Sequence, residues 1–560
     1  KGRLLALAVE GSDEAPLMVV GDAVQRGTPW YAWRLAMRAI LGDASSAMER
    51  LQDHPDLQEL HPLLGQVLGA EVPDTAVTAG LKGFVRAGRT MDLMVELLRR
   101  ANPGGGTLLV EDAHWLDQAS MALLARLRGR LQPLRLIIAT RPEVDPTPAW
   151  QSLTSGARTL QLRALDRAGI RLLLQERVGT ELPPSLVSWV LEHGDGNPFF
   201  ALELVAGLQE SGRLVVEEGV LARVPDDEEL AAFEPPATVE GAVTWRIDAL
   251  DPVAQAVVKT ASVLGASFAL GELLEVHPDS SQVEPALREL LRAGLLEHKG
   301  ELRFSHVIVR DVAYGRMPLD QRRQLHARAA AALEAQPEAL RRGRMPLLAW
   351  HWATCDEDRA LEALEWCWHD ARREGAMHEA YRFLVRADEL ERGLRERGEP
   401  GATRMRRAGW QRRMAAAVAG VGAPVAIHDH AEQALVLLER PPPKDPGGWK
   451  LAALKALLLR LWQVVAPRSS WQAQEDRVND RAEEAMAWTR LAEAHFYLKS
   501  NPLAMLTSAL RAVNAARASG RVVPVTTAWG QLGLVAGSMG MDRLALSCVA
   551  EARAIADDLG

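Results

Sequence analysis

The sequence predicts an α/β core with a parallel sheet, followed by a helical segment, a winged helix and an all-α superhelix of stacked repeats. Three observations predict this order. The first third alternates short apolar runs with segments of helical period, which is typical of a parallel sheet covered by helices. A helix pair followed by two short strands comes next. Beyond about residue 320 the sequence is rich in Ala, Leu and Arg and contains no convincing strand.

The length of 560 residues corresponds to about three or four domains at roughly 150 residues each. Hydrophobic residues make up 48% of the chain and charged residues 25%, so each domain can bury a core. We predict four domains from the changes in pattern: the core in 1–163, a helical lid in 164–235, the winged helix in 236–318 and the repeats in 319–560.

Charge and cysteine usage exclude several classes of protein. Lys and Arg number 65 against 73 Asp and Glu, and the net charge of −8 gives no general attraction to nucleic acid or to a membrane surface. Cys355, Cys367 and Cys548 lack the spacing of a zinc site or redox pair, which indicates buried thiols in a reducing compartment. No uncharged apolar run reaches the roughly 18 residues of a membrane span. We therefore expect a cytoplasmic protein.

The strand candidates of the core are short apolar runs bounded by Gly or Pro. They cover residues 17–20, 107–110, 136–140 and 159–162. From 166 to 210 the pattern is helical and is interrupted by the turn Gly194-Asp-Gly-Asn-Pro198.

The winged helix is predicted from helices around 253–262 and 283–293 and from two short strands that flank the Lys299-Gly300 turn. Its second helix carries as many acids as bases, whereas insertion into a DNA groove needs a basic face. We interpret this domain as an intramolecular switch, and we expect no direct contact with nucleic acid.

The helical region carries a repeat signal and a basic cluster. Ala504 and Ala545 occupy matching positions in two similar stretches, and their offset of 41 residues is near the period of stacked helix pairs. The segment Arg404-Met-Arg-Arg-Ala-Gly-Trp-Gln-Arg-Arg413 holds five arginines. It could bind an acidic partner or nucleic acid, but a solvated helix face is the favoured interpretation.

The segment Thr107-Leu-Leu-Val-Glu-Asp-Ala-His-Trp-Leu-Asp117 is the most informative motif. A buried strand brings Glu111 and Asp112 to its carboxyl end, where the ligands of open α/β sheets bind. This is the Walker B arrangement, in which one carboxylate holds Mg²⁺ and the other polarises a water. By position Glu111 takes the metal role and Asp112 the catalytic role, and the two roles can be exchanged. The alternative is a pair of solvated carboxylates.

A second strand ends in Ala139-Thr-Arg-Pro-Glu143 and would place Thr140 and Arg141 at the same edge. Arg is the usual donor to developing phosphate charge, so Arg141 is a catalytic candidate and Thr140 a nucleotide contact. A surface loop arginine is the alternative.

The first residues, Lys1, Gly2 and Arg3, look like the last part of a phosphate-binding loop, in which a Lys reaches the β and γ phosphates. No Met precedes Lys1, and we expect that the chain starts inside this loop. Gly2 stands where the Mg²⁺-binding Ser or Thr belongs. The pattern therefore predicts nucleotide binding with weak hydrolysis.

Four motifs occur in a characteristic order: the Glu111 and Ala139 segments, Gly196-Asn-Pro-Phe-Phe200 and Phe304-Ser-His-Val-Ile-Val-Arg-Asp-Val-Ala-Tyr314. This set resembles the STAND class of AAA+ signal-transduction ATPases. The resemblance implies a P-loop NTPase core, a lid, a winged helix and a tetratricopeptide-type sensor, with ATP and Mg²⁺ as cofactors. It also implies that Gly196 and Pro198 lie against the nucleotide.

Within that class, the segments 239–248, 258–268 and 61–75 look most like the regulatory portion of class III adenylate or guanylate cyclases. Large LuxR-type transcription activators are the alternative group, and either effector would lie outside this sequence. The resemblance implies an ATP-dependent switch whose repeats bind a protein partner or a small-molecule signal, with nucleotide-dependent oligomers. A scaffold whose NTPase core has decayed remains the alternative. His114 and His306 lack partners at ligand spacing, so we interpret them as structural.

Overall fold

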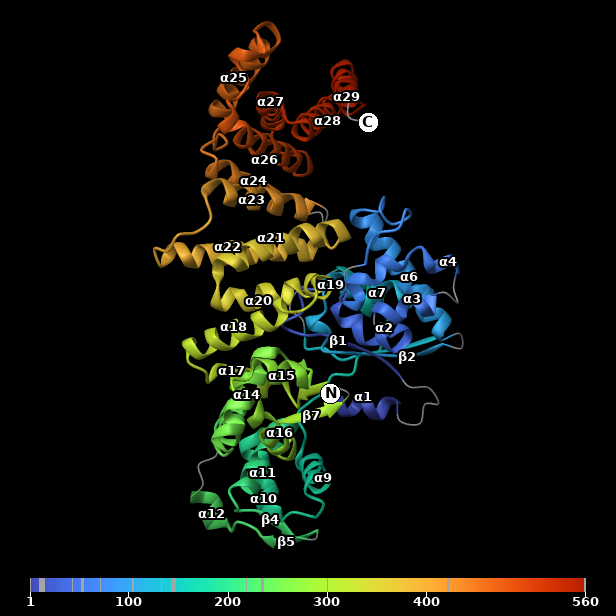
Figure 1. The fold of residues 1–560 in the computed structure, drawn as a ribbon, viewed down its shortest axis with the longest axis vertical. Coiled ribbons are helices and arrows are strands. Elements are labelled where there is room, and N and C mark those ends of the chain that lie inside the picture. Colours follow the sequence, from blue (N-terminus) through green and yellow to red (C-terminus); the bar gives the residue numbers. More distant parts are fainter. Residues whose placement is uncertain are drawn as a thin grey trace. The chain divides into compact units, whose positions relative to one another are not determined.

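The computed structural model describes most of the chain. It covers residues 2–9, 16–42, 44–51, 55–70, 72–102, 105–131, 133–142, 148–217, 219–232, 236–299, 301–419 and 423–557. The chain divides into two compact units, which are described separately (Figure 1). The first comprises Lys1–Asp145, Met345–Ala349 and Glu357–Gly560, and the second comprises Pro146–Arg344 and Trp350–Asp356.

A three-stranded parallel sheet organises the start of the first unit. Its strands are β1 (Leu17–Val20), β2 (Gly106–Glu111) and β3 (Leu134–Ile138), in the order β1-β2-β3. Val19 and Val110 on adjacent strands are fully buried, which fits their apolar runs. The fold class and three of the four predicted strands are therefore confirmed.

The fourth predicted strand is wrong. Residues 159–162 form no strand, and they lie in an irregular segment between α8 (Pro148–Thr154) and α9 (Arg167–Val178). Leu160 is 77% exposed, so the apolar alternation that suggested a strand does not face a core. An extended segment without a neighbouring strand has no ladder partner, and alternation alone does not supply one.

Helices that bury one apolar face surround the sheet. The elements are α1 (Gly2–Val9), α2 (Arg34–Leu41), α3 (Ala44–Leu51), α4 (Pro55–Gln58), α5 (Gly65–Leu68), α6 (Gly83–Ala101) and α7 (Gln118–Arg130). In α6, Leu93, Met94, Leu97 and Leu98 repeat at helical spacing and are buried. Asp117 caps the start of α7, because its carboxylate accepts the backbone N–H of Ser120.

The second unit begins with helices and one hairpin. These are α9, α10 (Pro184–Gly194), α11 (Pro198–Glu210), the antiparallel strands β4 (Val215–Glu217) and β5 (Val220–Arg223), and α12 (Asp227–Ala232). The hairpin is an addition to the purely helical pattern that the sequence predicts for this segment. Ile170, Leu174, Leu186 and Leu204 are among the buried residues that join α9, α10 and α11 in one core.

A winged helix follows in the same unit. It contains α13 (Val239–Asp248), α14 (Pro252–Leu264), β6 (Ser267–Phe268), α15 (Leu270–Val276), α16 (Val283–Arg292), β7 (Leu296–Lys299), β8 (Glu301–Phe304) and α17 (Val307–Gly315). The sheet order is β6-β8-β7, with antiparallel pairs. Both predicted helices and the hairpin across residues 299–300 are confirmed, whereas the two-residue strand β6 is too short to be seen in the sequence.

Two contacts tie the lid helix α11 to the winged helix. Gly207 of α11 lies under Trp245 of α13, where an added Cβ would be 1.7 Å from the ring. Arg246 donates to both carboxylate oxygens of Glu203, at 3.0 and 2.9 Å, and also to Glu210. Arg246 is only 4% exposed, so this charge is compensated inside the protein.

Stacked helical pairs form the rest of the chain, and no strand occurs among the described residues after β8. The helices are α18 (Leu319–Glu334), α19 (Glu338–Gly343), α20 (Met345–Cys355), α21 (Glu357–Glu374), α22 (Met377–Glu396), α23 (Arg404–Ala419), α24 (Pro424–Leu437), α25 (Pro446–Val465), α26 (Val478–Tyr497), α27 (Pro502–Ser519), α28 (Val522–Ser538) and α29 (Asp542–Asp557). Ala504 and Ala545 lie in the second helices of the pairs α26–α27 and α28–α29, as a repeat requires. In the described part of the chain, no helix is both long and apolar enough to cross a membrane.

The interpretation of the arginine cluster as a solvated face is wrong. Trp410 is fully buried in the stack. Arg406 pairs with Glu365 of α21 at 2.8 Å, and Arg412 pairs with Glu483 of α26 at 2.5 Å. The cluster joins three successive helical pairs, because the acidic partners lie on helices that are distant in sequence.

We predict that Gly207→Ala lowers the free energy of unfolding of the second unit by about 1–3 kcal/mol, because a methyl group forces the Trp245 ring out of its packed position. Gly271→Ala on α15 is the matched control, since nothing lies within 4 Å of its added Cβ. Thermal denaturation measures both variants. Equal stabilities of the two variants would contradict the packing argument.

Candidate functional site

The predicted acidic pair lies at the carboxyl end of the central strand. β2 ends at Glu111, and Asp112 follows in the left-handed region with φ 47° and ψ 46°. Asp tolerates this conformation better than most residues, and it turns the chain sharply away from the strand. Both carboxylates are half-buried. The sheet therefore places two adjacent acids at the edge where α/β proteins bind ligands.

Backbone hydrogen bonds fix the neighbouring strand ends around this pair. The N–H of Gly21, just after β1, donates to Glu111 O at 2.9 Å. The N–H of Ala139, just after β3, donates to Val110 O at 2.8 Å. The N–H of Ala113 returns a bond to Ala139 O at 3.0 Å. The three strand ends consequently meet at one edge.

Gly21 is a site residue that the sequence reasoning missed. A Cβ at this position would lie 2.3 Å from the carbonyl oxygen of Asp112, so only glycine allows the two chains to pass. The available signal is the glycine itself, directly after the apolar run of β1. Gly21 thus sets the backbone position of Asp112.

Thr140 and Arg141 follow β3 at the same edge. The hydroxyl of Thr140 donates to Arg141 O at 3.0 Å, and the Arg141 side chain is exposed. The structure therefore brings both residues to the edge that carries Glu111 and Asp112. Their predicted roles, phosphate contact and charge stabilisation, stay predictions.

The remaining predicted contacts lie elsewhere. Lys1 is outside the described residues, and Gly2 and Arg3 are described only as the first backbone positions of α1, which packs against β2. Gly196 and Pro198 belong to the second unit, in the turn between α10 and α11.

That turn connects two of the sequence motifs within the second unit. Asn197 caps α11 by accepting the N–H of Phe199 at 3.0 Å, and Gly196 has a positive φ of 65°. The Phe199 ring stacks on the ring of His306, with 4.2 Å between their centroids. The lid turn and the start of α17 therefore contact one another directly, and His306 has a packing role there.

A buried carboxyl pair lies close behind the acidic edge. Asp117 accepts the N–H groups of Ser120 and Trp30, at 2.8 and 3.3 Å. Glu379 of α22 accepts the N–H of the next residue, Gln118, at 2.6 Å. Burial, reinforced by the negative charge of Glu379, raises the pKa of Asp117 to about 7. Burial also raises the pKa of Glu379.

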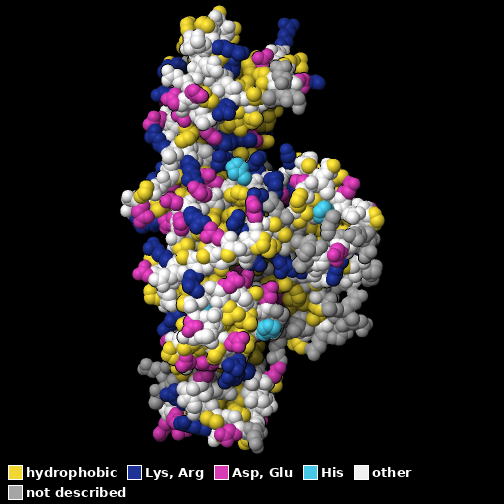
Figure 2. Space-filling view, viewed as in Figure 1, with side chains coloured by type: hydrophobic (Ala, Val, Ile, Leu, Met, Phe, Trp, Pro, Cys, Tyr) yellow, Lys and Arg dark blue, Asp and Glu magenta, His cyan; other side chains and the backbone are white. Residues whose placement is uncertain are grey.

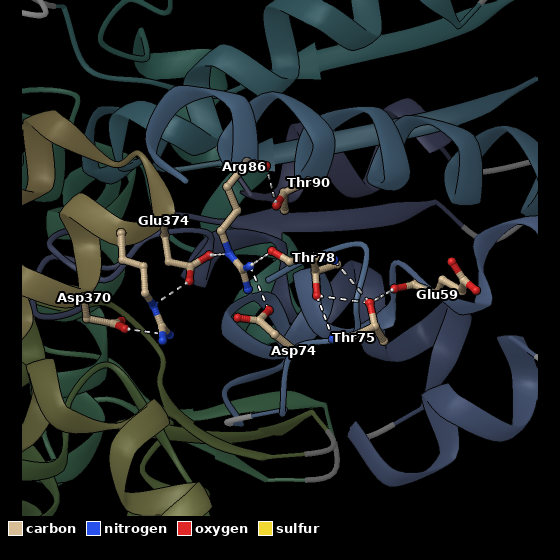
Figure 3. A network of polar contacts seen from close by, with 9 residues as sticks. Glu59, Asp74, Thr75, Thr78, Arg86, Thr90, Asp370 and Glu374 are labelled. Carbon is tan, nitrogen blue, oxygen red and sulfur yellow. Dashed lines mark hydrogen bonds and ion pairs between the residues drawn. The ribbon is translucent and has the colours of Figure 1, made fainter. Parts of the chain in front are cut away.

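A second buried contact joins the core to the same helical pair. Arg86 of α6 donates to Glu374 of α21 at 2.6 Å, to Asp74 at 2.8 Å and to the carbonyl of Thr78 at 3.2 Å (Figure 3). Arg86 and Glu374 are 4% and 6% exposed. Removal of one partner of such a buried pair leaves an uncompensated charge, which typically costs about 3–5 kcal/mol. The sequence holds no local signal for this pair, whose members are 288 residues apart.

The donor set at the sheet edge fits Mg²⁺. This ion prefers oxygen ligands and is commonly held by one or two carboxylates together with substrate phosphates and waters. Glu111 and Asp112 supply that number of carboxylates. Among the residues that the structure describes, no group of three or more His, Cys, Asp or Glu side chains could hold a metal by itself.

No family model matches the chain, and no curated protein matches it. Two solved structures are similar in fold. A signal transduction ATPase with numerous domains (STAND) from Pyrococcus horikoshii, with a tetratricopeptide repeat sensor, aligns over 100% of this chain and 77% of its own, at 14% identity and a TM-score of 0.38. BtubC from P. vanneervenii aligns over 55% of this chain and 93% of its own, at 11% identity and a TM-score of 0.25. Both likenesses are loose, and the function must be inferred from the residues of this chain.

We predict that Glu379→Gln weakens the pH dependence of stability. Because folding raises the pKa of Asp117 to about 7, the folded chain binds more protons than the unfolded chain between about pH 4 and 7. The free energy of unfolding therefore falls as the pH rises through this window, by up to about 1.4 kcal/mol per pH unit for this group. Glutamine keeps an acceptor for the Gln118 N–H and removes the charge.

Urea denaturation between pH 5 and pH 8 measures this effect. The variant should show a shallower fall than the wild-type chain and a higher stability at pH 8. Glu396→Gln, at an exposed position of the same helix, is the control and should leave the profile unchanged. Identical profiles for Glu379→Gln and the wild-type chain would contradict the assignment.

Proposed function

We propose that the chain is an ATP-binding signal-transduction switch of the STAND type, with the nucleotide and Mg²⁺ bound at the carboxyl edge of the β1-β2-β3 sheet. The observation that carries this proposal is the acidic pair Glu111-Asp112 at the end of the central strand, between the Gly21 turn and Thr140-Arg141. A pair of solvated carboxylates would not require this convergence of three strand ends.

Each residue of the edge has a role in the proposal. Glu111 would hold the ion, which neutralises phosphate charge when it is bound. Asp112 would orient a water and accept its proton, and Arg141 would approach the phosphates from the neighbouring strand end. Lys1, Gly2 and Arg3 would contribute from the start of α1, and Thr140, Gly196 and Pro198 would contact the nucleotide.

Regulation would act through the helical pair α21–α22. Glu374 and Glu379 contact α6 and the start of α7, and α7 begins seven residues after Glu111. A ligand that shifts α21–α22 would therefore disturb the segment that leads from the acidic pair. The signal would be a protein or a small molecule bound to the repeats, and the switch would regulate an effector such as a nucleotide cyclase or the DNA-binding part of a LuxR-type regulator.

We predict that wild-type protein binds ATP in a Mg²⁺-dependent manner and that Glu111→Gln with Asp112→Asn weakens this binding by about tenfold or more, because the ion loses both carboxylates. Isothermal titration calorimetry with Mg²⁺ and with EDTA measures the difference. The matched control is Asp227→Asn with Glu228→Gln, an adjacent and exposed acidic pair on α12. Absence of ATP binding to the wild-type chain, or equal binding by both double variants, would overturn the proposal.

A scaffold without ATP turnover is the second candidate, and one observation favours it. Gly2 stands where a Ser or Thr hydroxyl would bind Mg²⁺. For a switch that hydrolyses ATP, Gly2→Ser should raise the rate of phosphate release, since the hydroxyl adds a ligand to the ion. The measurement is release of inorganic phosphate at saturating ATP, with Gly2→Ala as the control. An unchanged rate in Gly2→Ser would favour the scaffold.

A further inference from the structure

The helix α25 is held in the first unit by one face only. Trp449, Ala452, Ala456 and Gln463 are its buried residues, and the helix packs on α27. Two buried hydrogen bonds fix the contact: Gln463 donates to Asn514 O at 3.0 Å, and the Asn514 amide donates to Ala456 O at 2.8 Å. The helix is therefore anchored, and its orientation relative to α27 is set.

The opposite face of α25 is apolar and exposed. Leu451, Leu454, Leu458, Leu461 and Val465 are 54%, 53%, 56%, 62% and 82% exposed. At roughly 100° per residue these five side chains fall within a sector of about 80°, on the side of the helix opposite to the buried face. We call this face the α25 seam.

The spacing of the α25 seam is that of a coiled-coil helix. Its residues follow one another at intervals of three and four, which matches the a and d positions of a heptad. The seam spans 15 residues, or about 22 Å. Leu457 and Val464 border it and are also exposed. Hydrophobic side chains are visible where α25 lies at the top of the view (Figures 1 and 2).

The charges beside the α25 seam are all positive. Lys450 and Lys455 are exposed and lie on opposite sides of the seam, and α25 contains no acidic residue. The third cation, Arg460, lies over the Trp529 ring at 4.7 Å and is directed away from the seam. In a chain with a net charge of −8, this local positive rim is an exception. A contiguous apolar surface with a polar rim is typical of an interaction site.

We propose that the α25 seam is a docking surface for an amphipathic helix of a partner protein, with Leu-type residues along its contact line and Glu or Asp on both flanks. The heptad spacing supplies the holes for such a helix, and the two lysines supply the complementary charges. The inference deepens the proposal that the repeats bind a protein, and it does not require nucleotide binding.

A second copy of this chain and a membrane fit the observations less well. In a parallel pair of α25 helices, Lys450 of one copy would face Lys455 of the other, and an antiparallel pair would leave both lysines without an acid. Stable membrane attachment requires a larger basic cluster than two lysines, since each contributes only about 1 kcal/mol.

The probe is a synthetic peptide of about four heptads with Leu at a and d and Glu at e and g. The control peptide carries Lys at e and g. Fluorescence anisotropy with the full chain should show binding of the Glu peptide that weakens as salt is raised, and binding of the Lys peptide at least about tenfold weaker.

The variants test the seam and its charges separately. Leu458→Glu should weaken binding of the Glu peptide at least about tenfold, because it places a carboxylate in the contact line. Lys450→Glu with Lys455→Glu should reverse the preference between the two peptides. The matched control is Leu546→Glu on α29, a leucine that is 72% exposed and lies outside α25. Circular dichroism establishes that each variant is folded.

Three results would overturn the proposal. The first is equal binding of the Glu peptide by the wild-type chain and Leu458→Glu. The second is a dimer, seen by sedimentation, that Leu458→Glu dissociates, which would identify a second copy as the occupant. The third is binding to vesicles of phosphatidylcholine and phosphatidylglycerol in a 3:1 ratio without binding of the Glu peptide. ATP calorimetry on the same samples distinguishes failure of the docking proposal from failure of the nucleotide site.

Discussion

The first unit depends on charged groups that are buried where the core meets α21–α22. Arg86 and Glu374 compensate one another, and the carboxyl groups of Asp117 and Glu379 share a dry environment close to backbone N–H donors. Desolvation makes each of these groups costly unless its partner is present. The contact therefore holds one arrangement of core and helical pair and disfavours others, which is the property that a switch requires of its resting state.

This contact lies next to the chemistry of the sheet edge. Asp117 begins α7 and follows the acidic pair by five residues, so the helix that contacts α22 is continuous with the segment that would hold the ion. Gly21 adds a steric limit, because a larger residue there would displace the backbone of Asp112. Movement of the repeats and the geometry of the edge are thus linked through a short, tightly packed stretch of chain.

The second unit uses the same devices. Trp245 fits against a bare glycine, Arg246 neutralises Glu203 and Glu210, and Phe199 stacks on His306. These residues come from the motifs that carry the resemblance to STAND ATPases. Their contacts give those motifs a physical purpose, since they keep the lid helix α11 and the winged helix as one packed body.

Local pattern in the sequence determined the three parallel strands, the winged helix, the stacked helices and the acidic pair at the end of β2, because apolar period and strand-end position are encoded within a few residues. The same reasoning failed at 159–162, where alternation lacked a neighbouring strand. Only the tertiary structure decided the partners of Arg86, Asp117 and the arginines of α23, and the exposure of the α25 seam. Those depend on residues up to several hundred positions away, and no local pattern records which helix packs on which.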